Sequence, residues 1–169
     1  MTRSKLVGLL FEAWNDLDRV LADLGHEEAI RSADGDSSFA WTVAHLASQL
    51  DFAINVRFQK RDPHPLISQS RFRAGGSGAA DDWTAIQATA HEVREAAHTY
   101  LESMDDDDLN AVIPYDGPLS RLRETGLSLR YTLLRTCAHH YFHIGEIASK
   151  RNRLGHQVGE YPGPLEECI

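Results

Sequence analysis

The sequence predicts an all-α fold, a four-helix bundle, and three observations support this prediction. Apolar residues recur at three- and four-residue spacings in four long stretches, which is the pattern of amphipathic helices. The segments between these stretches are rich in glycine, proline, serine and aspartate, which interrupt helices. No segment is rich enough in strand-forming residues to indicate an α/β fold. The length of 169 residues predicts a single domain that spans 1–169.

The helices are expected over residues 4–24, 39–60, 81–104 and 128–154. Gly25 and Gly155 follow the first and the last of them, where a glycine commonly ends a helix. Pro63 and Pro65 end the second helix, because proline lacks the amide hydrogen and clashes with the preceding turn. The middle of the last helix is apolar on most sides, which predicts a central place in the core.

The connections differ in length. Residues 62–80 form a long connection that includes the glycine-rich run Gly75–Gly78, and they either cross the end of the bundle or cover a site. We read the four aspartates Asp105–Asp108 as a solvated loop and not as a metal cluster. Residues 109–126 are expected to be irregular, and a short strand or hairpin there is considered but not predicted. Residues 156–169 are expected to pack as an extended tail.

The composition excludes several classes of function. Seventeen basic and twenty-five acidic residues give a net charge of −8, which argues against binding to nucleic acids or to anionic membranes. No apolar run approaches the roughly 18 residues of a membrane-spanning helix. Two cysteines do not form a disulfide framework, so the expected compartment is the cytoplasm.

Two of the nine histidines lie on one face of the last helix. At about 100° per residue, His139 and His143 differ by only about 40° in direction, which is the spacing by which one helix offers two imidazoles to one metal ion. Glu146 lies close to the same stripe, three residues further on. His140 points about 100° away, so it is not expected to join the pair.

A third ligand must come from another helix, because a catalytic zinc site commonly takes three protein ligands and leaves one position open. The best candidate is His45, which lies mid-helix beside a strongly apolar face. Ligands at His45, His139 and His143 would join the second and fourth helices through the metal, as facing helices of bundles often do.

Competing interpretations fit less well. A zincin protease needs H-E-x-x-H, but His140 occupies the place of the glutamate. A di-iron bundle needs Glu-x-x-His pairs on two helices, which this sequence lacks. His91 and His98 share a face of the third helix but lie two turns apart, too far for adjacent ligands. A plain bundle without metal, in which the histidines are hydrogen-bonded in the core, remains an alternative.

At these residues the sequence resembles the DinB/YfiT-like family of metal-dependent enzymes. The segment Trp41–Ser48, with the letters WTVAHLAS, is similar to the family's second-helix segment with its single ligand histidine. His139–Ile147 is similar to the family's H-x-x-x-H-x-G-Q-I on the last helix. Leu154–His156 is similar to the segment in which a leucine-glycine pair ends the family's last helix. The order of the expected elements also matches that of the family over nearly the whole chain.

The resemblance implies a four-helix bundle that holds a divalent metal, zinc or nickel, through His45, His139 and His143. It also implies a homodimer. Some relatives transfer low-molecular-weight thiols such as bacillithiol or use mycothiol in an isomerisation, and many have no known activity. Glu146 stands where the family has glutamine. That carboxylate could orient a ligand imidazole, act as a base, coordinate the metal, or pair with Lys150 four residues on.

The sequence therefore predicts a metal-binding protein that transfers a low-molecular-weight thiol to a small electrophilic substrate, with Glu146 as the candidate catalytic residue. Thiol transfer is preferred on the family analogy alone. Two alternatives stay open: a metal-dependent hydrolase, and a non-catalytic binding or stress-response protein that the metal staples together. An open fourth coordination position at the metal would distinguish an enzyme from a protein in which the metal is purely structural.

Overall fold

The computed structural model describes residues 2–32 and 35–168 and confirms the all-α prediction. Its long helices are α1 (Lys5–Leu21), α3 (Phe39–Leu50), α4 (Trp83–Leu101) and α6 (Leu129–Arg153). Each begins after a residue whose side-chain oxygen accepts a hydrogen bond from an amide of the first turn, namely Ser4, Ser38, Asp82 and Ser128. These caps explain why every long helix begins within two residues of its predicted start.

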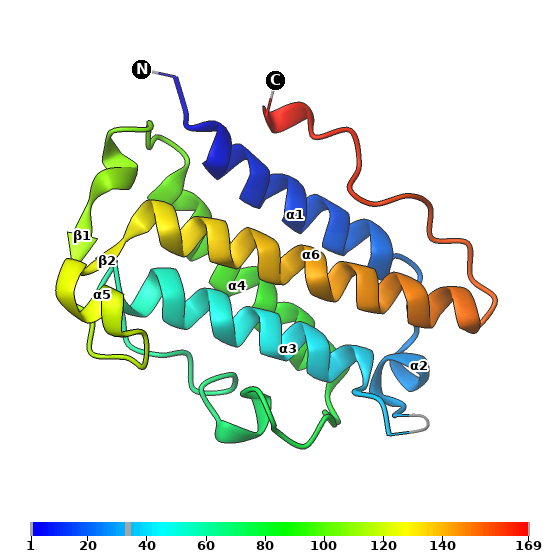
Figure 1. The fold of residues 1–169 in the computed structure, drawn as a ribbon. Helices are drawn as coiled ribbons and strands as arrows, with labels where there is room; N and C mark the ends of the chain where they lie inside the picture. Colours follow the sequence, from blue (N-terminus) through cyan, green and yellow to red (C-terminus); the bar gives the residue numbers. More distant parts are fainter. Residues whose placement is uncertain (1, 33–34, 169) are drawn as a thin grey trace.

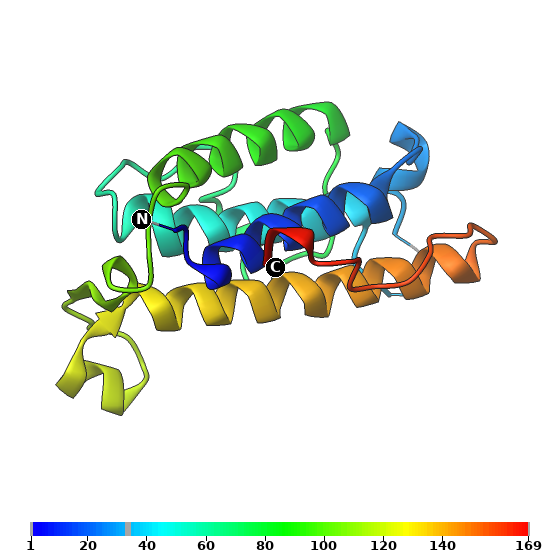
Figure 2. The same ribbon diagram turned by 90° about the horizontal axis from the view of Figure 1, so that it is seen from above.

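The four long helices form a bundle with a defined order of neighbours. α6 packs against α1 on one side and against α3 on the other, and α4 packs against α3. α1 and α6 run in one direction, whereas α3 and α4 both run in the opposite direction (Figure 1, Figure 2). Because α3 and α4 are parallel, the chain between them must return along the bundle. The long connection therefore crosses the length of the bundle beside α3, and not merely its end.

The second predicted helix, over 39–60, is shorter and less regular than expected. The α-helix ends at Leu50 and continues as a π-helical segment, η1 (Asp51–Val56). Within it the buried Asn55 donates its side-chain amide to Asp51 Oδ1 at 3.1 Å and to a carbonyl oxygen of α4 at 3.1 Å. The prediction of regular helix to residue 60 was wrong, because apolar periodicity does not reveal a polar pair that the wider turn places in the core.

Several short elements complete the chain. They are α2 (His26–Ile30), α5 (Ser120–Thr125), the 3₁₀ turns η2 (Ser70–Phe72), η3 (Asp108–Asn110) and η4 (Glu166–Cys168), and the strands β1 (Val112–Ile113) and β2 (Leu127–Ser128). β1 and β2 pair antiparallel around α5, so a hairpin that was not predicted stands at the start of α6. The aspartate run is mostly exposed, as predicted.

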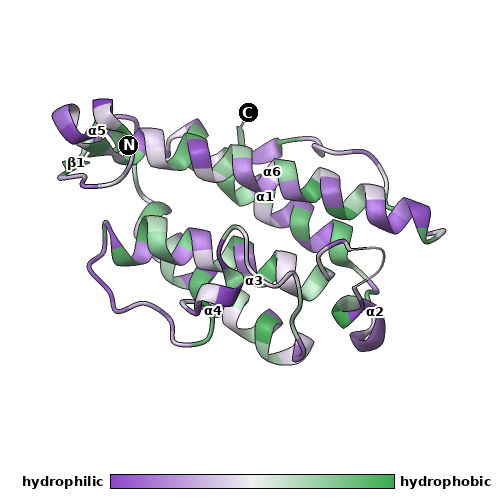
Figure 3. Ribbon diagram, turned by 60° about the horizontal axis from the view of Figure 1, so that its bottom comes forward, coloured by the Kyte–Doolittle hydropathy of each residue, from purple (hydrophilic) through white to green (hydrophobic). Residues whose placement is uncertain are grey.

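The core lies between the inward faces of the long helices. Leu10 and Leu17 of α1, Leu46 of α3, and Leu133 and Ile144 of α6 are almost fully buried. In Figure 3 hydrophobic residues recur on the sides of these helices that face their neighbours, and hydrophilic residues gather on the outer sides and the loops. Among the described helices, none has both the length and the apolar character that crossing a bilayer requires.

The tail packs in the extended manner predicted, although its end forms a 3₁₀ turn and residue 169 lies outside the described residues. It runs back along α1 (Figure 2). The amide of Gly163 donates to Asp16 Oδ2 at 3.0 Å, and the amide of Glu167 donates to Glu12 Oε1 at 2.7 Å. Both carboxylates are buried, so the tail supplies the hydrogen bonds that α1 needs on this side.

Candidate metal centre

Three histidines from two helices converge in the middle of the bundle. The Nε2 atoms of His45 in α3 and His139 in α6 lie 3.1 Å apart. The ring of His143 lies 5.2 Å from that of His45 and 4.6 Å from that of His139, measured between centroids. One ligating nitrogen from each ring lies within 4.8 Å of the other two. The structure thus brings together the three residues predicted as ligands.

The helices explain this convergence. His139 and His143 are one turn apart on the face of α6 that packs against α3. His45 lies near the middle of α3, which runs antiparallel to α6 alongside it. His45 and His143 are buried, and His139 is half-buried, so the site has one side nearer to solvent.

The ring of His45 is held from two sides. Its Nδ1 donates to the carbonyl oxygen of Phe72 at 2.7 Å, which leaves Nε2 as the nitrogen that faces the other histidines. The indole of Trp41 stacks on the imidazole at 5.0 Å with an interplanar angle of 4°. Trp41 in turn donates its Nε1 hydrogen to the carbonyl oxygen of Arg71 at 2.7 Å. The long connection before α4 therefore fixes the orientation of this ring through two backbone carbonyls.

The ring of His143 is held by a carboxylate on its own helix. Its Nδ1 donates to Glu146 Oε2 at 2.7 Å, and Glu146 Oε1 accepts from Lys150 Nζ at 2.7 Å. The hydrogen bond from His143, followed by the charge and hydrogen bond of Lys150, lowers the pKa of Glu146 to about 2. The carboxylate is therefore ionised at neutral pH with both oxygens engaged.

The surroundings favour uncharged imidazoles. Burial lowers the pKa of His45, although its hydrogen bond to Phe72 opposes the shift. Burial, with the nearby charges of His143 and His45 next in importance, lowers the pKa of His139 to about 4. A neutral imidazole keeps a lone pair on one ring nitrogen, so these two side chains can donate to a cation at neutral pH without first losing a proton.

His140 does not join the cluster, as its helical phase predicted. It is buried on another side of α6, where its Nδ1 donates to the carbonyl oxygen of Thr136 at 2.9 Å. His91 is exposed, and His98 stacks on Phe11 at 4.4 Å. Within residues 2–32 and 35–168, the group of histidine, cysteine and acidic side chains placed closely enough to hold a metal ion is His45, His139 and His143.

The three imidazole donors fit a divalent transition-metal ion, and zinc and nickel are among the ions that imidazole suits. Zinc binds imidazole nitrogen at about 2.0–2.1 Å in a tetrahedron, which places ligand nitrogens about 3.3 Å apart. The 3.1 Å between the nitrogens of His45 and His139 already approaches this spacing. Imidazole is a preferred ligand of zinc and nickel, and His143 has the carboxylate partner that commonly supports a metal-bound histidine. Three protein ligands would leave a position for water or substrate.

Three groups support the site: Trp41 and the Phe72 carbonyl were not predicted from sequence, whereas pairing of Glu146 with Lys150 was one of the roles considered for that carboxylate. The sequence does contain a signal for the stacking of Trp41 on His45, because Trp41 lies four residues before His45 on the same helix face. The contact of Lys150 with Glu146 follows from the same spacing, but its second bond, to the carbonyl oxygen of Ser37, is a tertiary contact without a sequence signal. The Phe72 carbonyl likewise reaches the site only through the path of the long connection.

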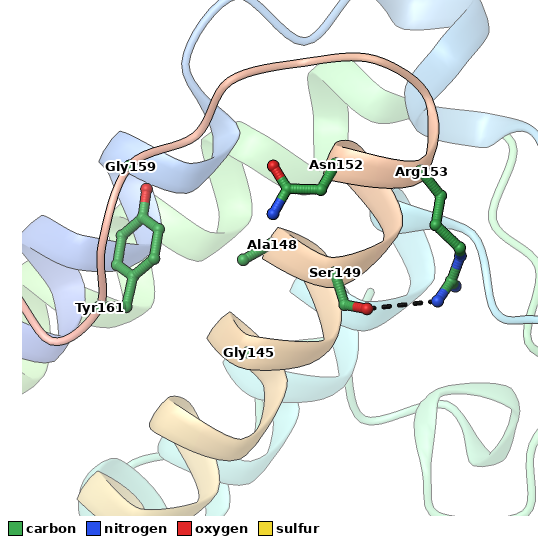
Figure 4. A pocket seen from close by; sticks show the side chains of 7 residues that line it. All are labelled: Gly145, Ala148, Ser149, Asn152, Arg153, Gly159 and Tyr161. Atoms are coloured by element: carbon green, nitrogen blue, oxygen red, sulfur yellow. Dashed lines mark hydrogen bonds between the residues drawn. The ribbon is translucent and has the colours of Figure 1, made fainter.

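A shallow pocket of about 580 Å³ lies between the last turns of α6 and the tail (Figure 4). Its lining comes from the outer face of α6 and from the tail: Gly145, Ala148, Ser149, Asn152, Arg153, Gly159 and Tyr161. None of the three clustered histidines lines it. The pocket and the candidate metal centre are therefore separate features of the same helix.

Comparison with known proteins agrees with this architecture. The family described as the DinB superfamily matches residues 9–147, a range that contains all three clustered histidines. The crystal structure titled as a conserved protein of locus from Enterococcus faecalis has the same fold, with a TM-score of 0.66 and 19% sequence identity. The match covers 92% of this chain and 99% of that one. No curated protein sequence matches this chain. Because the family match spans most of its length, this chain belongs to the DinB superfamily.

Proposed function

We propose that this protein binds one divalent metal ion, zinc or nickel, through His45, His139 and His143, and that it transfers a low-molecular-weight thiol to a small electrophilic substrate. The observation that carries the proposal is the convergence of three ring nitrogens within 4.8 Å of one another. Burial lowers the pKa values of His45 and His139, so these two rings present lone pairs and not positive charges at neutral pH. The membership of the DinB superfamily adds support for a metal.

A divalent cation in this cluster would act as a Lewis acid that favours the deprotonated form of a thiol or water bound to it. The chain's own residues have positioning roles. The Phe72 carbonyl keeps Nε2 of His45 free to ligate, and Glu146 holds Nδ1 of His143. The half-buried His139 lies on the side through which a small molecule could approach.

Thiol transfer is preferred over hydrolysis for a reason of geometry. Hydrolysis gains from a base that takes a proton from the attacking water, and both oxygens of Glu146 are occupied by His143 and Lys150. A thiol delivers a nucleophile more readily, because its pKa lies far below that of water. In the transfer the sulfur forms a bond to the electrophilic carbon, the leaving group departs with the electron pair of its bond, and the thiol proton passes to solvent.

The nucleophilic sulfur is expected to come from a small molecule and not from this chain. Burial raises the pKa of the Cys137 thiol to about 12, so it stays protonated at neutral pH. Burial also raises the pKa of Cys168, which lies in the tail against α1. Neither residue belongs to the histidine cluster.

The first test measures metal binding by untagged, metal-free protein in competition with a chromophoric chelator. We expect one zinc or nickel ion per chain and a loss of at least about 100-fold in affinity for His143→Ala. His140→Ala is the matched control, because it removes a neighbouring buried imidazole outside the cluster. Equal losses for both variants, or a wild-type protein that binds neither ion, would end the proposal of a metal centre.

The second test measures turnover. The zinc and nickel forms are incubated with cysteine, glutathione, bacillithiol or mycothiol and with 1-chloro-2,4-dinitrobenzene, whose reaction with a thiol releases chloride and gives an absorbing thioether. Metal-dependent conjugation that is lost in His143→Ala supports thiol transfer. Tight metal binding without conjugation by any of the thiols would instead favour the non-catalytic alternative.

A further inference from the structure

Lys150 is a buried cation beside the candidate metal centre. It lies in the last two turns of α6, and only 9% of its surface is exposed. Its ammonium donates to Glu146 Oε1 at 2.7 Å and to the carbonyl oxygen of Ser37 at 2.9 Å. Burying a lysine is costly unless the charge is paired and hydrogen-bonded, so these two contacts explain how it is tolerated there.

The same carboxylate connects Lys150 to a predicted metal ligand. Glu146 binds Lys150 through Oε1 and Nδ1 of His143 through Oε2, so neither oxygen can turn away without breaking a charge-assisted hydrogen bond. The other contact of Lys150, Ser37, directly precedes Ser38, the residue that caps α3. Lys150 thereby joins the helix that carries His143 to the start of the helix that carries His45.

We propose that Lys150 is a positioning residue for the metal centre: by holding Glu146 against Nδ1 of His143, it keeps Nε2 of that ring directed at the ion. This inference rests on the proposed metal-binding function and extends it to a residue that does not touch the ion. A group that accepts a hydrogen bond from a metal-ligating histidine fixes which ring nitrogen carries the hydrogen and limits rotation of the ring. Lys150 acts one contact further out, on the carboxylate that has this role.

A purely structural role for Lys150 can be separated by a matched control. Arg153 is also basic, lies in the last turn of α6 and reaches the same segment before α3, with its Nη2 3.3 Å from Asp36 Oδ2. It is much more exposed and makes no contact with Glu146. If Lys150 merely fastened residues 36–37 to α6, Lys150→Met and Arg153→Met would have similar effects on the metal centre.

The metal arm of the experiment compares wild type, Lys150→Met, Lys150→Arg and Arg153→Met. Zinc affinity is measured by competition, and the cobalt-substituted forms are compared by their visible d–d spectra. We expect Lys150→Met to weaken zinc binding by roughly 10- to 100-fold and to shift the cobalt bands, because loss of a ligand's supporting partner commonly costs that much. Lys150→Arg restores both, since its guanidinium can donate to a carboxylate and a carbonyl together. Arg153→Met behaves as wild type.

The second arm uses metal-free protein, so it does not depend on metal binding. Long-range proton–nitrogen correlation spectra at pH 8 report which nitrogen of His143 carries the hydrogen. We expect Nδ1–H in wild type and Arg153→Met, and a mixture of both tautomers in Lys150→Met. Should Lys150→Met fail to fold, Lys150→Gln takes its place, because glutamine keeps a polar head without the charge.

The two arms distinguish the possible failures. Equal losses of zinc affinity in Lys150→Met and Arg153→Met, or an unchanged His143 tautomer in Lys150→Met, would overturn the role of Lys150. If wild-type protein binds no metal but the tautomer still depends on Lys150, the positioning of His143 stands and the proposed metal function fails.

Discussion

In two of the three clustered imidazoles, Nδ1 donates a hydrogen bond to an acceptor outside the cluster. For His45 the acceptor is the Phe72 carbonyl, and for His143 it is Glu146. The third, His139, makes its hydrogen bond within the cluster, to His45 itself. A cation would replace this last contact and leave the two outer ones intact. Two of the three rings are therefore already held in place in the structure, as a preformed ligand set requires.

The buried histidines give the metal-free protein a specific acid sensitivity. Burial lowers the pKa of His140 to about 3, while an unfolded chain has histidine near its ordinary value of 6.5. Between these values the unfolded state binds more protons, so stability falls as the pH drops from about 6.5 toward 3. Each such histidine contributes a slope of up to about 1.4 kcal/mol per pH unit.

We therefore predict that metal-free protein is less stable to urea at pH 5 than at pH 7, and that His140→Gln flattens this dependence. Glutamine can still donate to the carbonyl oxygen of Thr136 but does not titrate. His91→Gln, at an exposed position on α4, is the matched control and should keep the wild-type slope. Identical slopes for wild type and His140→Gln would contradict the assignment of His140 as a neutral buried group.

At the scale of elements, two glycines on long helices illustrate how closely the tail is packed. A Cβ added at Gly8 of α1 would overlap the carbonyl oxygen of Glu167 in η4, so the tail requires a glycine there. A Cβ added at Gly145 of α6 would meet no atom within 4 Å. The same substitution should thus have opposite effects at the two sites.

We predict that Gly8→Ala displaces the tail and that Gly145→Ala stabilises the protein by about 0.5–1 kcal/mol, because alanine is the better helix former. Urea denaturation measures the stability, and hydrogen exchange measures the tail. The amides of Gly163 and Glu167, which donate to Asp16 and Glu12, should lose protection in Gly8→Ala only. Retained protection at Glu167 in that variant would show that the tail can be accommodated without the glycine.

The sequence was most informative where a contact is local. The spacing of His139 and His143, the helix caps and the course of the apolar faces all follow from residues a few positions apart. His45 could be selected as the third ligand because an imidazole on a strongly apolar face needs a partner. Local patterns did not reveal η1, where the buried Asn55 donates to Asp51 and to a carbonyl oxygen of α4.

Other features could not be predicted, because they depend on how distant segments meet. The parallel course of α3 and α4 is a property of the whole bundle, and it decides that the connection passes the candidate metal centre. The short strand pair between β1 and β2 joins residues on either side of α5 and has no periodic pattern. Likewise, Nε2 of His156, which follows α6, lies 2.7 Å from Glu28 Oε1 in α2, a contact between distant segments.

At the scale of the whole molecule, the homodimer expected from the family resemblance stays a prediction. Leu134 and Phe142, on the outer side of α6, are 52% and 69% exposed, and burying them would favour association. We predict that light scattering gives the mass of a dimer and that Phe142→Glu lowers it to that of a monomer. Leu154→Glu, at an exposed position beyond the end of α6, is the matched control. A wild-type protein that is monomeric at all concentrations would refute this prediction.

His45 and His139 are separated by 94 positions in the chain but share one hydrogen bond. During synthesis, the first of these imidazoles leaves the ribosome long before the second, and both α4 and α5 are made in the interval. A cation cannot be enclosed by all three rings until the part of α6 that carries His139 and His143 has emerged. During synthesis, enclosure of the ion by all three rings therefore has to follow the emergence of α6 and cannot precede it.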